Sequence, residues 1–327
     1  MLDNKTILVT GGTGSFGQKF IDTILKKYKL KKVIVFSRDE FKQFEMAKIY
    51  PTEKYPIRYF LGDVRDRERL VRAFHGVDYV VHSAALKQVV ALEYNPMEAV
   101  KTNIMGADNI INAAIECGVK KVIALSTDKA VNPVNLYGAT KLAAEKTFVA
   151  ANAYAGGKVI FGVVRYGNVM GSRGSVIPYF LDLKAQGIKE FPITDKRMTR
   201  FWMLLEESVA LVLKALEHSV GGEVFIPKIP SMNIIDLAKA IEPKCTFKFF
   251  GIRPGEKVHE SLFSEDESRN TVLFKDMYVI LPSFGLEDNV YAKYHKIPKV
   301  KEGYVFRSDT NDQWLTIKDL QDRMKKI

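Results

Sequence analysis

Short apolar segments alternate with helical patterns along the first half of the chain. The segments are nearly unbroken runs of aliphatic and aromatic residues, and each interval between them fits one helix. Such strands are typical of a parallel sheet whose two faces are both covered by helices. The pattern therefore predicts an α/β fold with a doubly wound parallel sheet. Its expected strands are Thr6–Thr10, Lys32–Ser37, Ile57–Leu61, Tyr79–His82, Val122–Ser126 and Val159–Arg165.

The regular alternation ends near residue 169. A helical pattern over Leu205–His218 and a strand pattern over Val224–Pro227 indicate that about 203–228 return to the main sheet. Scattered prolines and glycines mark the rest of the second half as a mixture of short elements. We therefore expect a main domain over 1–169 and a smaller lobe built from 170–202 and 229–327.

Composition narrows the class of protein. The chain has 327 residues, 47% hydrophobic and 27% charged, which is ordinary for a globular protein. No apolar run reaches the roughly 20 residues that a membrane span needs. The N-terminus leads almost directly into a strand, so we expect no signal peptide. Two cysteines, Cys117 and Cys245, are too few for a disulfide framework or a metal cluster. We therefore predict a cytoplasmic protein without a metal site or a membrane partner.

The net charge of +11 raises the possibility of a nucleic-acid partner. However, Lys and Arg are spread along the chain, and no basic module with interleaved aromatic residues stands out. The densest run, 26–32, falls at an expected helix end, where cations suit the helix dipole. We interpret the charge as a lysine-rich solvated surface that also suits anionic small molecules, and we expect no nucleic acid to bind.

A glycine-rich turn follows the first strand. Its glycines are spaced GxxGxxG and precede a helical pattern that continues to about Lys27. Glycines at these points permit a tight turn and let backbone N–H groups approach a pyrophosphate at a helix N-terminus. Because the turn lies between a first strand and a helix, it predicts a Rossmann domain that binds a dinucleotide. The expected contacts are Gly11, Thr13, Gly14, Ser15, Phe16 and Gly17.

The ends of the next strands complete the expected cofactor site. An NAD-preferring site commonly has an acid after strand two, whereas this chain has Ser37-Arg38, which suits the 2′-phosphate of NADP. We therefore predict NADP, although Asp39 and Glu40 follow directly. Asp63 is expected either to contact the adenine amine, with Val64 against the ring, or to cap the next helix. Further expected contacts are Asp39, Lys42, Ala84, Ala85 and Lys87.

Two neighbouring motifs carry candidate chemistry, Ser126-Thr-Asp-Lys129 and Tyr137-Gly-Ala-Thr-Lys141. Tyr137 and Lys141 can share one helix face, and a cation beside a phenol lowers the phenol pKa from its ordinary value of about 10. Asp128 and Lys129 add a carboxyl and an amine. Such a set suits an enzyme that oxidises a carbon, eliminates water and reduces again. The alternatives are a helix N-cap for Asp128 and a solvated charge for Lys129.

Taken together, the motifs resemble the extended short-chain dehydrogenase/reductase superfamily, and within it the inverting UDP-N-acetylglucosamine 4,6-dehydratases, which start pseudaminic acid synthesis for flagellin glycosylation. The resemblance covers nearly the whole chain. It rests on the glycine-rich turn, on Asp63, on both catalytic motifs and on the segments Arg165-Tyr-Gly-Asn-Val169, Gly171-Ser-Arg-Gly-Ser-Val176, Pro192-Ile-Thr-Asp195, Met198-Thr-Arg-Phe-Trp202, Phe225–Met232, Gly251–Lys257 and Asn311-Asp-Gln-Trp314. Related retaining enzymes carry Asp-Glu where this chain has Asp128-Lys129.

The resemblance implies a mechanism. Tyr137, kept as phenolate by Lys141, takes the proton from the sugar O4 while NADP accepts hydride from C4. Lys129, with a lowered pKa, removes the C5 proton, and protonated Asp128 gives its proton to the departing C6 hydroxyl. Hydride then returns to C6, and C5 is protonated from the opposite face. Thr127 is expected to hydrogen-bond O4.

The resemblance also implies a UDP-N-acetylglucosamine substrate and a homo-oligomer, a hexamer or a dimer. Arginines and a lysine of the second half, among them Arg253 and Lys257, are candidates for holding the diphosphate. Arg200 has a structural ion pair as its alternative, and Lys87 has exposure to solvent as its alternative. The expected substrate contacts are Lys87, Thr127, Lys129, Asn168, Arg173, Val176, Thr194, Met198, Arg200, Arg253 and Glu256.

One departure and two rival functions complete the sequence-based picture. The family usually reads Lys-His-Val-Pro after strand four, whereas this chain reads Lys87-Gln-Val-Val90, next to the expected sugar site. The nearest rival is a retaining 4,6-dehydratase or a 4-epimerase of a UDP-sugar, and an epimerase needs no acid and amine at C5 and C6. A non-catalytic dinucleotide-binding protein is the rival from another class, and such proteins commonly lose the Tyr or the Lys.

Overall fold

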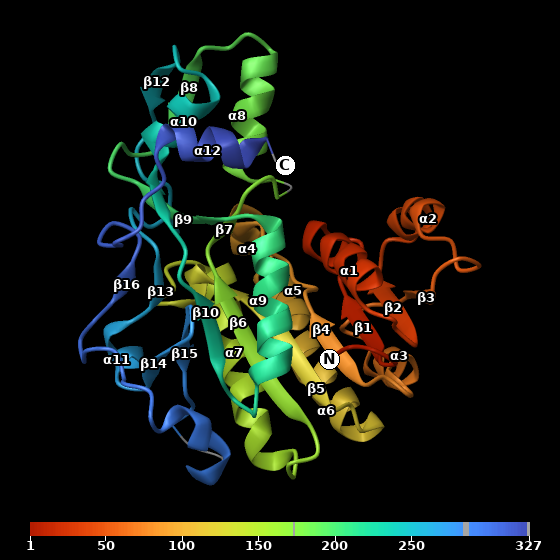
Figure 1. The fold of residues 1–327 in the computed structure, drawn as a ribbon. Helices are drawn as coiled ribbons and strands as arrows, with labels where there is room; N and C mark the ends of the chain where they lie inside the picture. Colours follow the sequence, from red (N-terminus) through yellow and green to blue (C-terminus); the bar gives the residue numbers. More distant parts are fainter. Residues whose placement is uncertain (173, 284–287, 326–327) are drawn as a thin grey trace.

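A nine-stranded sheet forms the centre of the computed structural model, which describes residues 1–172, 174–283 and 288–325 (Figure 1). The strands lie in the order β14-β15-β10-β6-β5-β4-β1-β2-β3. From β3 to β10 they are parallel, and β15 and β14 continue antiparallel beyond β10. The strand bounds are β1 (Thr6–Thr10), β2 (Lys32–Ser37), β3 (Ile57–Leu61), β4 (Tyr79–His82), β5 (Lys121–Thr127), β6 (Ile160–Tyr166), β10 (Val224–Pro227), β14 (Thr271–Phe274) and β15 (Met277–Ile280). The prediction of a doubly wound parallel sheet is confirmed.

Helices cover both faces of the sheet because successive strand residues are apolar on both sides. Val35 and Val81 pack in the cluster with α1 and α9, whereas Ile34 and Val80 pack in the cluster with α3, α6 and α7. The helix α2 adjoins β2 and β3. The helix bounds are α1 (Ser15–Lys27), α2 (Glu40–Ile49), α3 (Arg67–Phe74), α6 (Gly106–Cys117), α7 (Leu136–Tyr154) and α9 (Leu205–His218).

Short elements connect β4 to α6 and β5 to α7. The first connection contains a π-helical turn, η1, which runs without a break into α6, and the second contains the single 3-10 turn η2. Their bounds are α4 (Val89–Tyr94), α5 (Pro96–Ala99), η1 (Val100–Met105) and η2 (Asp128–Ala130).

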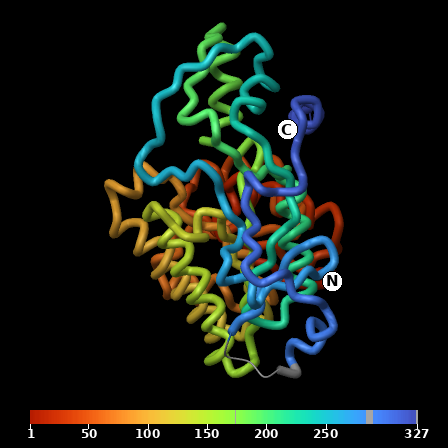
Figure 2. Tube along the Cα trace, turned by 90° about the vertical axis from the view of Figure 1, so that its left-hand side faces the viewer, coloured from red at the N-terminus to blue at the C-terminus, as the bar shows by residue number. Residues whose placement is uncertain are grey.

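A smaller lobe stands above the sheet (Figure 1). Its own core contains Phe180, Phe191, Trp202, Leu237 and Leu320. The lobe comprises α8 (Val176–Ala185), β8 (Glu190–Ile193), α10 (Ile234–Ile241), β12 (Thr246–Phe249) and α12 (Ile317–Met324), and the sheet β7 (Asn168–Val169), β9 (Thr199–Met203) and β11 (Ser231–Asn233) leads into it. Figure 2 shows the C-terminal segment climbing along the molecule to reach this lobe.

The boundary of the smaller lobe differs from the prediction. We expected all of 229–327 in the lobe, but β14 and β15 belong to the main sheet. Their Val272, Met277 and Val279 are buried in the core beneath α9, so the hairpin covers the edge that β10 would otherwise present. Near the hairpin lie β13 (Ser261–Phe263), α11 (Glu265–Ser268), η3 (Asp288–Tyr294) and β16 (Phe306–Arg307). In the described ranges, no helix is both long and apolar enough to cross a membrane.

Candidate active site

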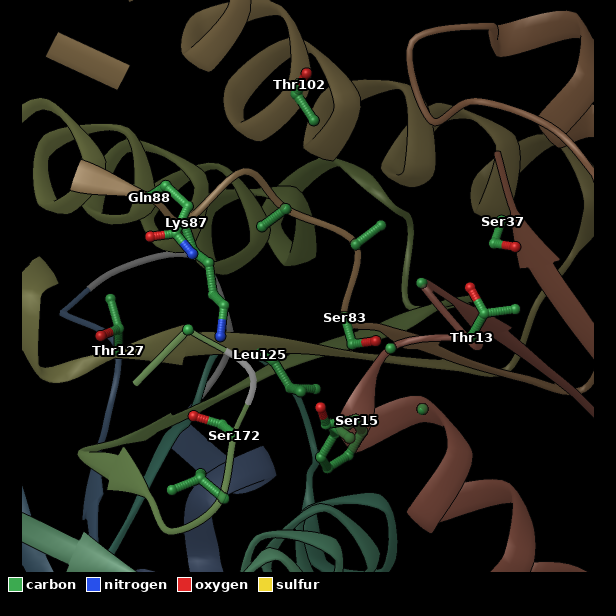
Figure 3. Close-up of a pocket in the computed structure, with 18 of the residues that line it drawn as sticks. Thr13, Ser15, Ser37, Ser83, Lys87, Gln88, Thr102, Leu125, Thr127 and Ser172 are labelled. Carbon is green, nitrogen blue, oxygen red and sulfur yellow. The ribbon is translucent and has the colours of Figure 1, made fainter. Parts of the chain in front are cut away.

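A cavity of about 630 Å³ lies at the carboxyl ends of the central strands. Figure 3 shows it extending from Thr13, Ser15 and Ser37 at one end to Gln88 and Thr127 at the other. All the residues predicted to bind the cofactor line this cavity, and so do Thr127, Lys129 and Asn168. The chain adds strands outward from β1 to β3 on one side and then from β4 on the other, so the strand order reverses between β1 and β4 while the strands stay parallel. Ligands of doubly wound folds bind at that point.

The glycine-rich turn brings three backbone segments together at this point. Gly11 has φ +64°, and a Cβ there would meet the backbone of Ala84 at 3.0 Å. A Cβ at Gly17 would lie 2.5 Å from Cα of Gly12, so only glycine lets α1 begin this close to the turn. The N-cap of α1 is Gly14, which has no side chain to occupy the first helical N–H groups. This geometry fits a pyrophosphate at the helix N-terminus.

The end of the cavity near Ser37, called the far end below, carries both positive and negative side chains. Arg38 lies 3.4 Å from Asp63, and Lys42 lies 2.6 Å from Asp39. Burial of Asp63 acts to raise its pKa, but hydrogen bonds from Arg65 and the charge of Arg38 lower it overall. Asp63 does not cap α3, because Asp66 occupies that position. The alternative of a helix cap for Asp63 is therefore wrong, and its carboxylate faces the cavity.

The motif after β5 places its three polar side chains in one hydrogen-bonded cluster. Thr127 Oγ1 donates to Asp128 Oδ1 over 2.9 Å, and Lys129 Nζ donates to the same oxygen over 3.0 Å. Thr127, not Asp128, is the N-cap of η2, and the Lys129 side chain is only 25% exposed. Asp128 is completely buried beneath the cavity and is joined to it through these two lining groups.

The start of α7 is held tightly against η2. Asn135 caps the helix by accepting a hydrogen bond from Gly138 N over 2.8 Å, and it donates to Gly255 O over 2.7 Å. A Cβ at Gly138 would lie 2.1 Å from Lys129 O, so the glycine after Tyr137 is what allows this contact. The segment around Gly255 therefore lies beside the start of α7.

Tyr137 and Lys141 both line the cavity, but their pairing differs from the prediction. Lys141 Nζ donates to Leu125 O over 2.7 Å, and burial lowers the pKa of Lys141 to about 8. Burial raises the pKa of Tyr137, against the opposing effects of the Lys129 charge and a hydrogen bond with Thr127. Lys129, rather than Lys141, is thus the cation that favours the phenolate in this structure.

The predicted lowering of the Lys129 pKa is wrong for this structure. Burial acts to lower it, but two carboxylates, Asp128 and Glu260, outweigh burial and raise the pKa of Lys129 overall. Glu260 Oε1 lies 3.5 Å from the amine. The sequence offered no signal for Glu260, because the contact joins distant parts of the chain.

The loop after β4 directs Lys87 toward the middle of the cavity (Figure 3). Asn103, in the π-helical turn, holds the loop by accepting from Leu86 N over 2.9 Å and donating to Leu86 O over 3.0 Å. Partial burial and the charge of Lys129 lower the pKa of Lys87. These observations favour a ligand contact for Lys87 over a purely solvated role.

Apart from Asn168, the predicted substrate residues of the second half that the structure describes are not among the residues that line the cavity. Arg200 donates to the carbonyls of Thr199, Lys257 and Val258 over 2.8 to 3.0 Å, so a diphosphate contact would require it to give up these bonds. Lys257 likewise donates to Val131 O. Arg253 is largely exposed and lies 3.8 Å from Glu256. Val176, Thr194 and Met198 also do not line the cavity, and Arg173 lies outside the described residues.

Several lining residues were not predicted. Some are apolar or small, and others lie within the quoted motifs but were given no binding role. They include Phe36, Gly62, Ser83, Gln88, Thr102, Leu125, Ser126, Tyr166, Gly167, Val169, Ser172, Gly174, Ser175 and Leu205. Buried polar atoms are normally hydrogen-bonded. Among the described residues, the four buried side-chain atoms without a partner are Thr102 Oγ1, Asp128 Oδ2, Ser175 Oγ and Glu260 Oε2. Two belong to the cavity lining and two flank Lys129, which fits a site built to receive a polar ligand.

Comparison with known proteins agrees with this geometry. The profile of a family described as polysaccharide biosynthesis protein matches residues 7–282. An inverting UDP-N-acetylglucosamine 4,6-dehydratase of Campylobacter jejuni (serotype O:23/36, strain 81-176) is 56% identical over 328 residues, covering 98% of each chain. A UDP-glucose 4-epimerase of Rickettsia massiliae is 46% identical over 302 residues, covering 90% of this chain and 87% of its own.

Among solved structures, Pen from Bacillus thuringiensis superposes with a TM-score of 0.90 at 37% identity, covering 100% of this chain and 98% of its own. The family match, the identity over almost the full length and the doubly wound sheet agree with one another. This chain therefore belongs to the polysaccharide biosynthesis protein family of extended short-chain dehydrogenases/reductases, together with the inverting UDP-N-acetylglucosamine 4,6-dehydratases.

Proposed function

We propose that this chain is a nicotinamide-dependent sugar-nucleotide dehydratase. It converts UDP-N-acetylglucosamine into UDP-2-acetamido-2,6-dideoxy-β-L-arabino-hex-4-ulose, with loss of water from C5 and C6 and inversion at C5. The observation that carries the proposal is the buried Asp128–Lys129 pair, which lies beside Tyr137 on the wall of a dinucleotide-type cavity. The 56% identical C. jejuni relative supports the substrate and the stereochemistry.

The chemistry of each side chain follows from its surroundings. A bound nicotinamide would supply the hydride acceptor for C4 and the hydride donor for C6. Tyr137 takes the O4 proton, since the Lys129 charge and the Thr127 hydrogen bond favour its phenolate. Oxidation at C4 acidifies the C5 hydrogen, which Lys129 then removes as a general base.

The raised pKa of Lys129 is compatible with this role because of its hydrogen bond to Asp128. Moving one proton from Nζ to Oδ1 across 3.0 Å turns the ion pair into a neutral amine and a carboxylic acid, without any proton entering from solvent. Exclusion of water by bound substrate favours the neutral pair, because desolvation penalises charges. Asp128 then supplies the proton for the departing C6 hydroxyl through the hydrogen bonds that join it to Thr127 and Lys129.

The test is incubation of the purified protein with UDP-N-acetylglucosamine in D₂O, followed by proton NMR. We expect a 6-deoxy-4-keto sugar with deuterium at C5 and L-arabino couplings. The D-xylo product would indicate a retaining dehydratase and would contradict the proposed role of Lys129. Epimerisation at C4 alone would favour the activity for which the Rickettsia relative is named.

We propose NADP as the cofactor because Ser37, Arg38 and Lys42 lie together at the far end of the cavity. The guanidinium of Arg38 is half exposed and can pair with a 2′-phosphate. Calorimetric titration of Arg38→Gln should show a loss of about tenfold or more in NADP affinity, with NAD affinity changed much less. Equal binding of both cofactors by the unmodified protein would contradict this choice.

We further propose that the product enters pseudaminic acid synthesis and that the protein is a homo-oligomer. Both proposals rest on the family resemblance. Sedimentation velocity of the purified protein tests the second, and a single species with the mass of one chain would contradict it.

A further inference from the structure

Glu260 is a buried carboxylate that the proposed reaction leaves without a role. Its side chain is only 4% exposed, and its Oε1 lies 3.5 Å from Lys129 Nζ. Its Oε2 lies 3.8 Å from Lys257 Nζ and has no hydrogen-bond partner among the described residues. Burying a charge costs free energy unless the charge is paired. The position of Glu260 beside the Lys129 amine therefore points to a role in the site.

The backbone fixes Glu260 in place. Glu260 N donates to Ser308 Oγ over 3.0 Å, and Ser308 N donates to Glu260 O over 2.8 Å. The strand that follows, β13, packs directly against η2, which carries Lys129. The residue directly before β13 is therefore fixed by two hydrogen bonds to Ser308, and its carboxylate lies beside Lys129.

The charges around Lys129 show what this carboxylate can do. When the Lys129 proton moves to Asp128, Glu260 becomes the one remaining carboxylate beside the amine within the described ranges. Burial and neighbouring cations oppose protonation of Lys129, whereas Glu260 favours it. The charged or titratable groups that face Lys129 are Asp128 on η2, Tyr137 on α7, Lys87 after β4, Arg200 on β9, and Lys257 and Glu260 before β13.

We propose that Glu260 is a positioning residue that holds the Lys129 amine in place and stabilises its ammonium form when it removes the C5 proton. The inference rests on the proposed dehydratase function for its catalytic consequence. The pairing itself is a property of the protein without substrate. In the reaction, the C5–H electron pair remains on the sugar and the proton passes to Nζ.

The first experiment measures the titration of Lys129 in the protein without ligand. The rate of Lys129 acetylation by acetic anhydride, followed by mass spectrometry across pH, reports the unprotonated amine. In the wild-type protein the midpoint should lie above the ordinary lysine value of about 10.4. In Glu260→Gln the midpoint should fall by about one unit or more, because one buried negative charge is lost.

Two further variants separate charge from structure. Glu260→Asp keeps the charge, so its midpoint should stay closer to wild type than that of Glu260→Gln. Asp266→Asn removes a negative charge from an 84% exposed side chain a few residues away and should leave the midpoint unchanged. A wild-type midpoint at or below the ordinary value, or an unchanged midpoint in folded Glu260→Gln, would overturn the inference.

The second experiment uses substrate. In Glu260→Gln, kcat for UDP-N-acetylglucosamine should fall by about tenfold or more, with KM changed much less. In oxidation at C4, Lys129 acts only through its charge beside Tyr137 and transfers no proton. The absorbance of reduced nicotinamide should therefore build up in a single turnover of this variant. Failure of the wild-type protein to dehydrate the sugar, with the Lys129 titration as expected, would contradict the proposed function but not the pairing.

Discussion

At the scale of single residues, the site contains a buried lysine, Lys141, and a partly buried lysine, Lys129, whose pKa values move in opposite directions. Lys141 has a backbone carbonyl as its hydrogen-bond partner, so burial dominates and its pKa falls to about 8. Lys129 lies between two carboxylates, and their charges outweigh burial. Two side chains of the same type thus have different pKa values because their neighbours carry different charges.

Replacement of Tyr137 by Phe removes the group that accepts the O4 proton. We expect kcat to fall by about 100-fold or more, because general base catalysis contributes this much, while the thermal midpoint changes little. Initial rates measured by NMR and differential scanning calorimetry check both parts. Tyr154→Phe, at an exposed tyrosine late in α7, should retain full activity.

A buried histidine makes stability depend on pH. His82 is enclosed next to Thr10, and burial together with the charge of Lys141 lowers its pKa to about 3. Below its ordinary value of 6.5 the unfolded chain binds a proton that the folded protein does not. The free energy of unfolding should therefore fall on acidification, by about 2 kcal/mol between about pH 7 and about pH 5 from this residue.

Urea unfolding at both pH values measures how the free energy of unfolding changes with pH. In His82→Asn the difference between the two values should shrink by about that amount. The same substitution at the exposed His295 should leave the difference as in wild type. An unchanged difference in His82→Asn would show that the pKa of His82 in the folded protein is close to its ordinary value.

At the scale of elements, close backbone approach determines the shape of the site. The turn before α1 and the start of α7 each depend on a glycine that faces another backbone segment. The π-helical turn η1 positions Asn103 so that it can hold both backbone groups of Leu86. π-Helical turns are rare and frequently occur at functional sites. These short elements, together with the first turns of α1 and α7, set the positions of many lining side chains.

Gly17→Ala tests the closeness of α1 to the glycine-rich turn. The added Cβ would meet backbone atoms of Gly11 and Gly12 at 2.5 to 2.7 Å, so α1 has to shift away from the turn. We expect the affinity for the cofactor to fall by about tenfold or more, since close approach of backbone N–H groups is lost. Calorimetric titration measures it, and Lys27→Ala at the other end of α1 serves as control. Unchanged affinity in Gly17→Ala would contradict a pyrophosphate site at this turn.

At the scale of the whole molecule, the core on the two faces of the large sheet is separate from the core of the smaller lobe. The large sheet presents the glycine-rich turn and the catalytic cluster, whereas the smaller lobe has a separate core closed by α12. The segment carrying Gly255 joins the two by its contact with Asn135. We therefore expect cofactor binding to depend on the sheet and binding of the UDP portion to depend also on the lobe.

Leu320→Ala tests this division. Leu320 is fully buried in the core of the smaller lobe, and its truncation should cost about 2 to 5 kcal/mol of local stability. Hydrogen exchange should increase in α10 and α12 with little change in the central strands. The affinity for UDP should fall more than the affinity for the cofactor. An equal loss of both affinities would mean that the two cores do not act separately.

The apolar strands, the glycine-rich turn and the two polar motifs were all recognisable in the sequence, and the structure brings the turn and residues of both motifs to one cavity. The strands from β1 to β4 begin and end where the apolar runs predicted, because a strand buried on both faces needs an uninterrupted apolar run. The glycine-rich turn was recognisable for a similar reason, since the constraint that it satisfies is local. Every residue predicted to bind the cofactor lines the cavity.

The contacts between distant segments could not be predicted from the sequence. The place of β14 and β15 in the main sheet, the use of Arg200 to hold backbone carbonyls and the pairing of Glu260 with Lys129 all join parts of the chain that are far apart in sequence. The direction of the Lys129 pKa shift depends on such contacts. Charge interactions depend on distance in space, which a single sequence does not specify. Burial patterns and turn geometry depend on residues close together in the chain, so the sequence predicts them.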